Sequence, residues 1–157
     1  MITCKFENGN ENSLRHVVVD ALVLKENKIL LIKRTKKILE GGKWGLVGGF
    51  VERNENLIEA IKREIIEESG YKVKDIKLLT IIDNPNRPKE DRQNIAFIFI
   101  CEALEKIGDH DWEVDDQKWF DFSNLPLKEE VAFDHYENIE LYLNHLKNKT
   151  LLPILRF

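Results

Sequence analysis

The sequence is poor in cysteine and contains no long apolar run. Its two cysteines, Cys4 and Cys101, are far apart, which is typical of reduced thiols in a cytosolic protein and not of a disulfide framework. The longest uninterrupted apolar run covers residues 95–101, whereas a membrane-spanning helix needs roughly 20 apolar residues. The N-terminus also lacks the basic start and apolar stretch of a signal peptide. We therefore expect a cytoplasmic protein without a membrane partner.

Positive charge is slightly outnumbered by negative charge. The 157 residues include 24 Lys and Arg against 28 Asp and Glu, which gives a net charge of −4 at pH 7. This is the wrong sign for a protein that binds nucleic acid through its phosphates. Hydrophobic residues make up 43% of the chain, which is enough for a core and too much for a disordered composition. The length predicts a single domain over residues 1–157.

Hydrophobic patterning and turn residues predict alternating strands and helices. Residues 16–24 and 28–34 are aliphatic runs separated by a turn at Asn27, as in a β-hairpin. Asp20 interrupts the first run, and we interpret it as a structural acid outside any site. Residues 41–49 are rich in glycine and predict a loop. Further along we expect strands over 76–82, 94–103 and 117–122, a proline-containing loop over 83–88, an acidic loop over 108–116, a helix over 134–147, and an extra strand or an association segment over 151–157.

A helix is expected over residues 57–69, between two clear boundary signals. Asn56 is a good N-cap with Glu59 three positions later, and Gly70 stands where a C-terminal stop belongs. At 100° per residue, the stripe that should face the core consists of Leu57, Ile58, Ile61 and Ile65.

Three carboxylates lie in or beside this apolar stripe. Glu68 falls inside it, Glu64 lies at its edge and Glu67 a little further round. Like charges at these spacings destabilise a helix, and partial burial adds to the cost unless a cation lies between them. A hard divalent cation, Mg²⁺ or Mn²⁺, suits such oxygen ligands. The alternative interpretation is a solvated glutamate-rich face with ordinary surface ion pairs.

The residues around this helix follow a spaced pattern. It reads Gly49-x5-Glu55-x7-Arg63-Glu64-Ile65-x-Glu67-Glu68-x-Gly70. From the composition of this chain, a chance match is expected roughly once in a million. The segment resembles the Nudix box of the Nudix hydrolases, here over residues 49–71. The resemblance implies an α/β fold, a Nudix-type α/β/α sandwich with a mixed sheet and a loop–helix–loop catalytic box, with residues 1–14 and 148–157 peripheral. It also implies Mg²⁺-dependent hydrolysis of a nucleoside diphosphate linked to another group.

The same resemblance implies roles for individual residues. The metal would be held by Glu64, Glu67, Glu68 and the carbonyl of Gly48. Structural support of the site would come from Gly49, Glu55, Arg63 and Gly70. The general base would be Glu64 or, on the acidic loop, Glu113, with Asp115 and Asp116 behind it; simple solvation of a charged loop is the alternative for that segment.

Two positions depart from the family pattern. Val47 replaces the usual proline, so the metal loop has more backbone freedom, but no reactive group is lost. Tyr71 replaces an aliphatic residue and affects local packing, not chemistry.

Basic and aromatic residues outside the box point to the substrate. Arg34 and Lys43 are candidates for phosphate contacts, and Trp44 for stacking on a base, although solvation and packing are their ordinary roles. Arg87 and Arg92 resemble an arginine-containing segment of ADP-ribose pyrophosphatases. Residues 132–135 look like a segment common in that subgroup and in related regulators of NAD metabolism. His135 by itself is interpreted as a helix-start or surface residue.

These features favour ADP-ribose or a similar nucleoside diphosphate sugar as the small nucleotide substrate. The enzymatic alternative is a MutT-type pyrophosphohydrolase of oxidised nucleoside triphosphates. A non-catalytic nucleotide sensor is the alternative from another class, and the intact carboxylates speak against it. Family members are often homodimers, so a homodimer is expected here as well.

Overall fold

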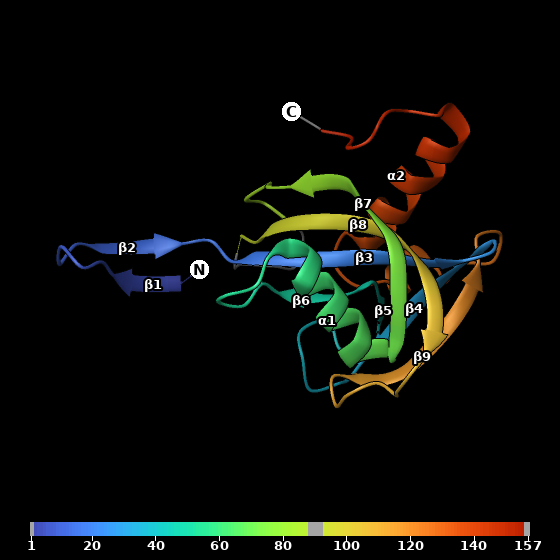
Figure 1. Cartoon of the computed structure of the whole chain (residues 1–157), viewed down its shortest axis with the longest axis horizontal. Coiled ribbons are helices and arrows are strands. Elements are labelled where there is room, and N and C mark those ends of the chain that lie inside the picture. Colours follow the sequence, from blue (N-terminus) through green and yellow to red (C-terminus); the bar gives the residue numbers. More distant parts are fainter. Residues whose placement is uncertain (1, 88–92, 156–157) are drawn as a thin grey trace.

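The computed structural model describes residues 2–87 and 93–155 as a mixed sheet with a helix on each face (Figure 1). The elements are β1 (Ile2–Lys5), β2 (Glu11–Leu14), β3 (Val17–Lys25), β4 (Lys28–Arg34), β5 (Trp44–Gly45), β6 (Val47–Phe50), α1 (Leu57–Ser69), β7 (Tyr71–Ile82), β8 (Ile95–Lys106), β9 (Val114–Asp121), the short 3₁₀ helix η1 (Lys128–Glu130) and α2 (His135–Asn148). The main sheet has the strand order β5-β4-β3-β8-β7, with β6 also paired to β3 and β9 to β4. No helix in the described ranges has the length and apolarity needed to cross a lipid bilayer.

The predicted hairpin is confirmed as β3 and β4. The two strands are antiparallel, with Val23 opposite Leu30 and Lys25 opposite Lys28. The left-handed turn residue is Glu26, with φ 56°, and not Asn27 as expected. β3 also runs parallel to β8, so the sheet is mixed and β3 lies in its interior.

Helix α1 begins and ends where the sequence predicts. The Asn56 side chain accepts hydrogen bonds from the N–H groups of Ile58 and Glu59, and the Glu59 carboxylate accepts from the Asn56 N–H. Gly70 ends the helix in the left-handed conformation, with φ 73°. A Cβ at this position would overlap the carbonyl oxygen of Gly108, so both the backbone angle and the space require glycine.

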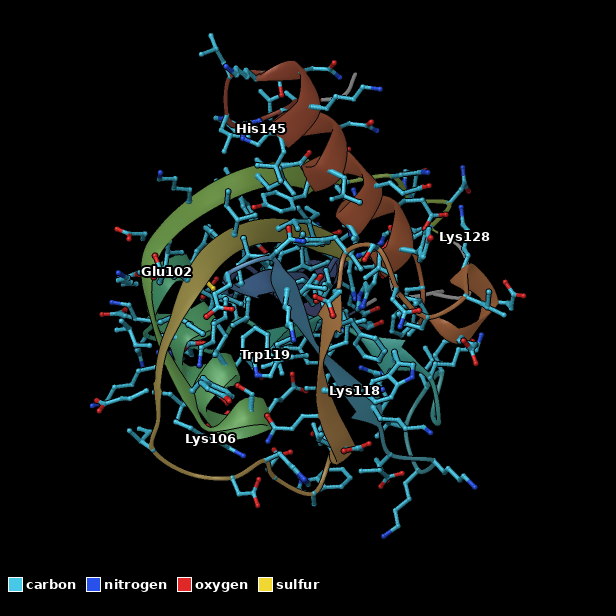
Figure 2. The ribbon with its side chains drawn as sticks, turned by 90° about the vertical axis from the view of Figure 1, so that its right-hand side faces the viewer. Glu102, Lys106, Lys118, Trp119, Lys128 and His145 are labelled. Atoms are coloured by element: carbon cyan, nitrogen blue, oxygen red, sulfur yellow. The ribbon has the colours of Figure 1, made fainter. Side chains whose placement is uncertain are left out.

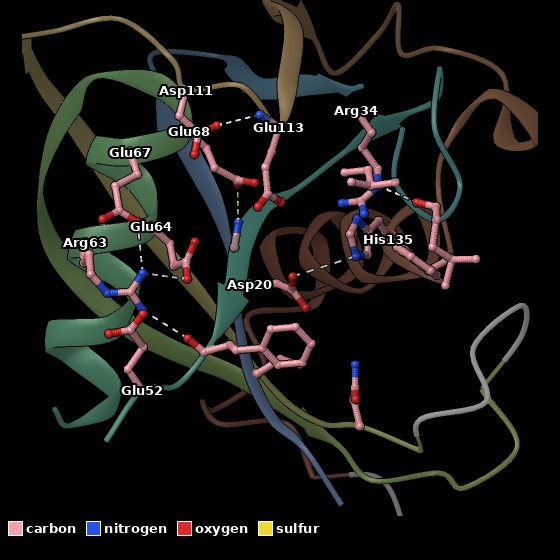
Figure 3. A pocket seen from close by; sticks show the side chains of 18 of the residues that line it. Asp20, Arg34, Glu52, Arg63, Glu64, Glu67, Glu68, Asp111, Glu113 and His135 are labelled. Carbon is pink, nitrogen blue, oxygen red and sulfur yellow. Dashed lines mark hydrogen bonds and ion pairs between the residues drawn. The ribbon is translucent and has the colours of Figure 1, made fainter. Parts of the chain in front are cut away.

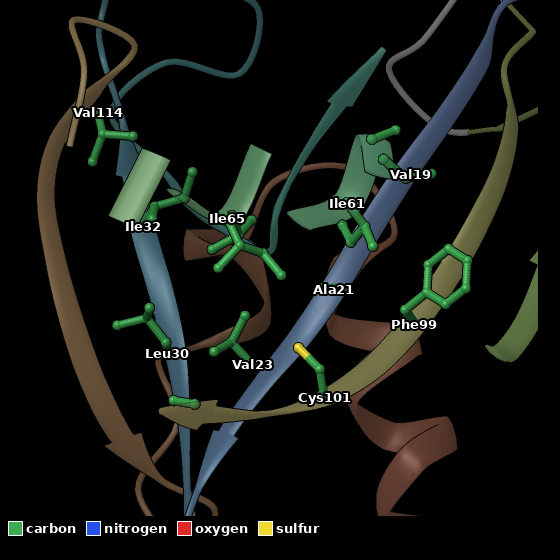
Figure 4. Close-up of a cluster of buried hydrophobic side chains, with 13 residues drawn as sticks. Val19, Ala21, Val23, Leu30, Ile32, Ile61, Ile65, Phe99, Cys101 and Val114 are labelled. Atoms are coloured by element: carbon green, nitrogen blue, oxygen red, sulfur yellow. The ribbon is translucent and has the colours of Figure 1, made fainter. Parts of the chain in front are cut away.

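Side chains of β3 alternate between two cores, one under each helix. Val19, Ala21 and Val23 pack toward α1, where they meet Ile61 and Ile65 (Figure 4). The neighbouring positions, Val18 and Leu22, pack on the opposite face in the cluster that contains Ile139 and Leu141 of α2. This period of two places Asp20 on the α2 face of the sheet.

The buried face of α1 differs in one position from the predicted stripe. Ile61 and Ile65 are buried and Leu57 is partly buried, as expected. Ile58 is 39% exposed, and Ala60 occupies a buried position instead. Glu68 is only 4% exposed, so a carboxylate does lie within the buried face.

Several strand boundaries differ from expectation because strands pair through segments expected as loops. The glycine-rich stretch contains β5 and β6, which pair with β4 and β3. β7 begins earlier than predicted, at Tyr71, and β9 shortens the acidic loop by beginning at Val114. Residues 151–155 form no strand, but Leu152 and Ile154 pack on the α2-side core and the Ile154 N–H donates to Leu79.

The two departures from the box pattern are accommodated by packing. Val47 is fully buried in the α1-side core. The Tyr71 ring packs edge-on against Trp119 at 5.5 Å, and the Trp119 Nε1–H donates to the Tyr71 hydroxyl; Trp119 points inward from β9 in Figure 2.

The N-terminal segment forms an element that the sequence did not predict. β1 and β2 pair with each other as a separate two-stranded sheet, with Ile2 opposite Leu14. In Figure 1 this ribbon projects away from the main sheet.

Candidate active site

A cavity of about 400 Å³ opens between α1, β6 and the start of α2 (Figure 3). Its α1 side is anionic, and its opposite side carries cationic, aromatic and imidazole groups. The anionic side is lined by Glu52, Glu64, Glu67, Glu68, Asp111 and Glu113, with Gly48, Gly49 and Arg63. The opposite side includes Asp20, Arg34, Arg87, Phe133 and His135.

Arg63 ties the carboxylates of α1 to the loop that precedes it. Its guanidinium donates to Glu55 at 2.8 and 3.1 Å, to Glu64 at 2.8 Å and to Glu67 at 3.0 Å. It also donates to the carbonyl of Phe50 at 3.0 Å, at the end of β6. These hydrogen bonds, with Glu55 contributing most, raise the pKa of Arg63 above its ordinary value, so it stays a cation. Arg63 thereby holds helix, loop and strand in one arrangement.

Glu68 reaches from the buried face of α1 to the backbone of β6. Its Oε2 accepts a hydrogen bond from the Gly48 N–H at 2.8 Å. Burial raises the pKa of Glu68 well above its usual range, although the Gly48 bond and Arg34 act in the other direction. A Cβ at position 48 would overlap the carbonyl oxygen of Val19, so only glycine allows β6 to lie this close to β3.

Glu64 lies directly against the second glycine of β6. A Cβ at position 49 would come within 2.5 Å of Glu64 Oε1, so Gly49 leaves the space that the carboxylate occupies. Burial raises the pKa of Glu64, and repulsion from Glu67 and Glu113 adds to this effect while Arg63 opposes it.

The loop before β9 brings two further carboxylates to the cavity. The Asp111 N–H donates to the Glu67 carbonyl at 2.9 Å, and the Asp111 carboxylate accepts from the Glu113 N–H at 2.9 Å. The Thr35 N–H donates to the Glu113 carbonyl and fixes the far end of this loop. Asp115 and Asp116 lie in β9, away from the lining of this cavity.

The donor set of the anionic side is suited to a divalent cation. The side-chain atoms of this side that can bind a metal are all carboxylate oxygens, the ligands that Mg²⁺ and Mn²⁺ prefer. In the described part of the chain no three carboxylates surround a common point, because Glu64 and Glu67 turn to Arg63 and Glu68 turns to Gly48. Burial and mutual repulsion oppose the charged form of Glu64, and a cation would offset both effects.

Two arginines face this acidic group from the opposite side. Arg34 donates to the Leu39 carbonyl at 3.0 Å, and its guanidinium lies 5.2 Å from the Phe133 ring centre. Burial lowers the pKa of Arg34, and Glu68 is the largest of the charges that oppose this. Arg87 makes a buried bidentate pair with Asp134, at 2.9 and 2.6 Å, just before α2.

His135 and Asp20 form the inner end of the cavity. The His135 Nδ1 accepts a hydrogen bond from the Leu46 N–H at 2.9 Å, and its Nε2 lies 3.8 Å from Asp20 Oδ1 (Figure 3). Burial lowers the pKa of His135 to about 3. Burial also raises the pKa of Asp20 to about 7, with Arg87 opposing this shift.

Most of the residues predicted from sequence line this cavity. They are Arg34, Gly48, Gly49, Arg63, Glu64, Glu67, Glu68, Arg87 and Glu113. Glu55 lies behind Arg63, and Gly70 ends α1. Trp44 is not among the lining residues: its ring packs edge-on against Phe120 at 5.0 Å, so the structure gives it a packing role.

Other predictions need correction or lie outside the described chain. Lys43 pairs with Glu40 at 2.8 Å and does not line the cavity. Asp20 was interpreted as a structural acid but lines the cavity, and His135 is a helix-start residue as expected but is buried. The signal for Asp20 was its position between Val18 and Leu22 on a face that the period of two makes a core face. Arg92 lies outside the described residues.

Comparisons with known proteins identify the family and the fold. A family model described as NUDIX domain matches residues 14–142. The ADP-ribose pyrophosphatase of Methanocaldococcus jannaschii is 38% identical over 130 residues, which is 81% of this chain and 72% of that protein.

Solved structures share the fold. A NUDIX hydrolase from Nitrosomonas europaea has a TM-score of 0.79 and 22% identity, with 98% of this chain and 91% of that chain covered. A bifunctional NMN adenylyltransferase/ADP ribose pyrophosphatase from Francisella tularensis, complexed with AMP and a Mn ion, has a TM-score of 0.70 and 28% identity. This match covers 85% of this chain and 42% of that one.

The family match and the 38% identical relative place this chain, with its mixed sheet between two helices, among the pyrophosphohydrolases. The chain belongs to the Nudix hydrolase family. Enzymes of this family use divalent metal ions and act on nucleotide substrates.

Proposed function

We propose that this Nudix hydrolase cleaves the diphosphate linkage of ADP-ribose or a similar nucleoside diphosphate sugar with Mg²⁺. The observation that supports this proposal most strongly is the cavity of about 400 Å³. Its anionic α1 side lies opposite Arg34 and Arg87. A diphosphate between these sides would meet the metal on one and a guanidinium on the other. The similarity to the M. jannaschii ADP-ribose pyrophosphatase supports the substrate class.

In this proposal Glu64, Glu67, Glu68 and the carbonyl of Gly48 hold the metal, which when bound neutralises phosphoryl charge and lowers the pKa of water. Mn²⁺ would serve the same oxygen donors. Arg63 and Glu55 position the carboxylates, because one guanidinium contacts both the helix and its preceding loop. Gly49 and Gly70 provide space at the two ends of the box.

Arg34 is the proposed phosphate contact on the opposite side. Its Nε donates to Leu39 and its guanidinium lies near Phe133, so the fork is held in place without being paired to a carboxylate in the described residues. Arg87 keeps its bidentate bond to Asp134 and contributes positive charge and rigidity. Such fixed donors stabilise the developing charge of phosphoryl transfer without reorganising.

The proton of the attacking water is accepted by Glu64 or Glu113, which lie on the same side of the cavity. Glu64→Gln should lower kcat in either case, because Glu64 is also a proposed metal ligand, so Glu113→Gln decides between them. It should lower kcat by 10²- to 10⁴-fold if Glu113 is the general base, and should change kcat little if Glu64 is. Metal affinity, measured by Mn²⁺ titration, should fall for Glu64→Gln and change little for Glu113→Gln.

The substrate is tested by product analysis with Mg²⁺ present. AMP and ribose 5-phosphate from ADP-ribose support the proposal, whereas inorganic diphosphate from an oxidised dGTP as the preferred reaction would replace it with a MutT-type activity. Tight ADP-ribose binding without turnover would instead indicate a nucleotide sensor. Wild-type rates in both Glu64→Gln and Glu68→Gln would disprove the metal site. We also propose a homodimer, which sedimentation analysis checks.

A further inference from the structure

A buried carboxyl group lies where the pattern of the sheet calls for an apolar side chain. Asp20 is 7% exposed and stands on β3 between Val18 and Leu22, both of which pack in the α2-side core. Among the described residues, the side-chain contact recorded for its carboxyl is with His135 Nε2, at 3.8 Å from Asp20 Oδ1. A carboxyl group in such a place costs free energy unless a polar partner joins it. It lines the cavity, so that partner can come from the ligand.

His135, the neighbour of this carboxyl group, has its proton on a defined nitrogen. Because His135 Nδ1 accepts the Leu46 N–H, that nitrogen carries no proton, and the neutral imidazole carries its proton on Nε2. Nε2 is the atom that faces Asp20. The inner end of the cavity therefore presents one N–H donor and one carboxyl acceptor side by side, from α2 and β3.

The separation of these two atoms fits an oxygen between them. At 3.8 Å the Nε2–Oδ1 contact is too long for a direct hydrogen bond. An oxygen about 2.8 Å from each atom would form an angle of about 85° between them, close enough to tetrahedral for a hydroxyl that accepts from one and donates to the other. Hydroxyl groups have this dual capacity, whereas a phosphate oxygen would meet the carboxyl with the wrong charge.

The neighbours of this pair indicate which hydroxyl it receives. Arg34, the proposed phosphate contact, lines the same cavity as Asp20. The charges of Arg87 and Arg34 lower the pKa of Asp20, whereas those of Asp134 and Glu64 raise it. A hydroxyl bound there belongs to a group joined closely to the phosphates. The apolar ring of Phe133, tilted against His135 at 5.4 Å between centres, borders the same end.

We infer that Asp20 and His135 form a subsite for a sugar hydroxyl next to the diphosphate, so that the pair favours nucleoside diphosphate sugars over substrates without that hydroxyl. This inference rests on the proposed function and deepens it. Both pentoses of ADP-ribose carry such hydroxyls, and the substrates of the test distinguish them.

The test compares three substrates in the full chain with Mg²⁺. They are ADP-ribose, the butyl ester of ADP, which lacks the terminal sugar, and ADP-ribose with a 2′,3′-dideoxyadenosine half. The key variant is His135→Asn, because its amide oxygen can still accept the Leu46 N–H while the Nε2–H is lost. Asp20→Ala removes the acceptor, and Asp121→Asn, an exposed carboxylate paired with Lys28, is the matched control for charge.

The expected result is a substrate-dependent loss. His135→Asn and Asp20→Ala should lower kcat/KM for ADP-ribose roughly 10- to 100-fold, as expected for one lost hydrogen bond to substrate. The substrate that already lacks the recognised hydroxyl should change less than about twofold, and the control should match wild type on all three. An equal loss on every substrate, or no loss on any, overturns the subsite.

Failure of the proposed function has a different signature. If wild type hydrolyses none of the three compounds, they serve as non-reacting ligands and their Kd values are measured by calorimetry with Mg²⁺ present. The same pattern of ratios in Kd then supports the subsite without the hydrolytic activity. If the ratio of the His135→Asn Kd to the wild-type Kd is the same for all three ligands, the subsite is refuted.

Discussion

Gly49→Ala perturbs the proposed metal site by a single methyl group placed against a carboxylate. The added Cβ would lie 2.5 Å from Glu64 Oε1 and 2.6 Å from its Cδ. To reach an ordinary contact of about 3.4 Å, the carboxylate must move by roughly 0.9 Å. Its carbon stem is flexible, so the fold should lose less than about 1 kcal/mol.

Activity should respond far more strongly than stability. Metal–ligand distances tolerate only about 0.2 Å, and a displacement near 1 Å typically costs 10²-fold in rate. We expect kcat/KM to fall about 100-fold, which corresponds to roughly 2.7 kcal/mol of transition-state stabilisation. Addition of Glu64→Gln to Gly49→Ala should cause little further loss, because both changes act on one carboxylate.

The assay pairs urea unfolding with Mg²⁺-dependent turnover. Gly48→Ala is the matched control, because its Cβ would overlap the fixed carbonyl of Val19 and should instead destabilise the fold by about 3 kcal/mol. A Gly49→Ala enzyme within threefold of wild type, alongside an impaired Glu64→Gln, would refute the steric reasoning.

Three further substitutions test burial and charge. Arg87→Met leaves Asp134 buried without its guanidinium, so urea unfolding should show a loss of about 3–5 kcal/mol; a loss below 1 kcal/mol would contradict this. Burial holds the pKa of His135 at about 3, below its ordinary 6.5, so the unfolded chain takes up the proton first and stability falls as the pH drops below 6.5. At pH 5 this costs about 2 kcal/mol, and His135→Asn should lack that part of the acid loss. Burial raises the pKa of Glu68, so its ionised form destabilises the folded protein at pH values above the ordinary glutamate pKa. In EDTA at pH 8, Glu68→Gln should therefore have a Tm no lower than that of wild type. Its Tm should rise less than that of wild type when Mg²⁺ is added.

Helix α1 was predictable because its signals are local. The cap at Asn56, the acid at Glu59 and the stop at Gly70 act within a few residues of the chain, and the structure has the same bounds. Which residues of the helix face the sheet was less predictable. Ile58 is as hydrophobic as Ile61, but the sheet meets the helix on the side of Ala60, and only tertiary packing decides this.

Strand boundaries and Trp44 were harder to predict because they depend on partners distant in sequence. β6 exists through its pairing with β3, with Val47 opposite Ala21, although its own residues read as a glycine loop. A loop aromatic can stack on a ligand or pack on a core, and the position of Phe120 on β9 decides for packing. Neither partner is visible from the local pattern.

The cavity lies between the α1-side core and the α2-side core, at the two glycines of β6, Gly48 and Gly49. From the α1 side, Glu68 reaches the Gly48 N–H; from the α2 side, Asp20 stands opposite Gly48 in the β3–β6 register. A Cβ at position 48 would lie 2.8 Å from Asp20 Oδ1, so this glycine leaves room for the Asp20 carboxyl while its N–H donates to Glu68. Leu46, two residues earlier, fixes the ring of His135. Changes on α1 should therefore affect the metal side alone, whereas changes in β6 should affect metal binding and sugar discrimination together.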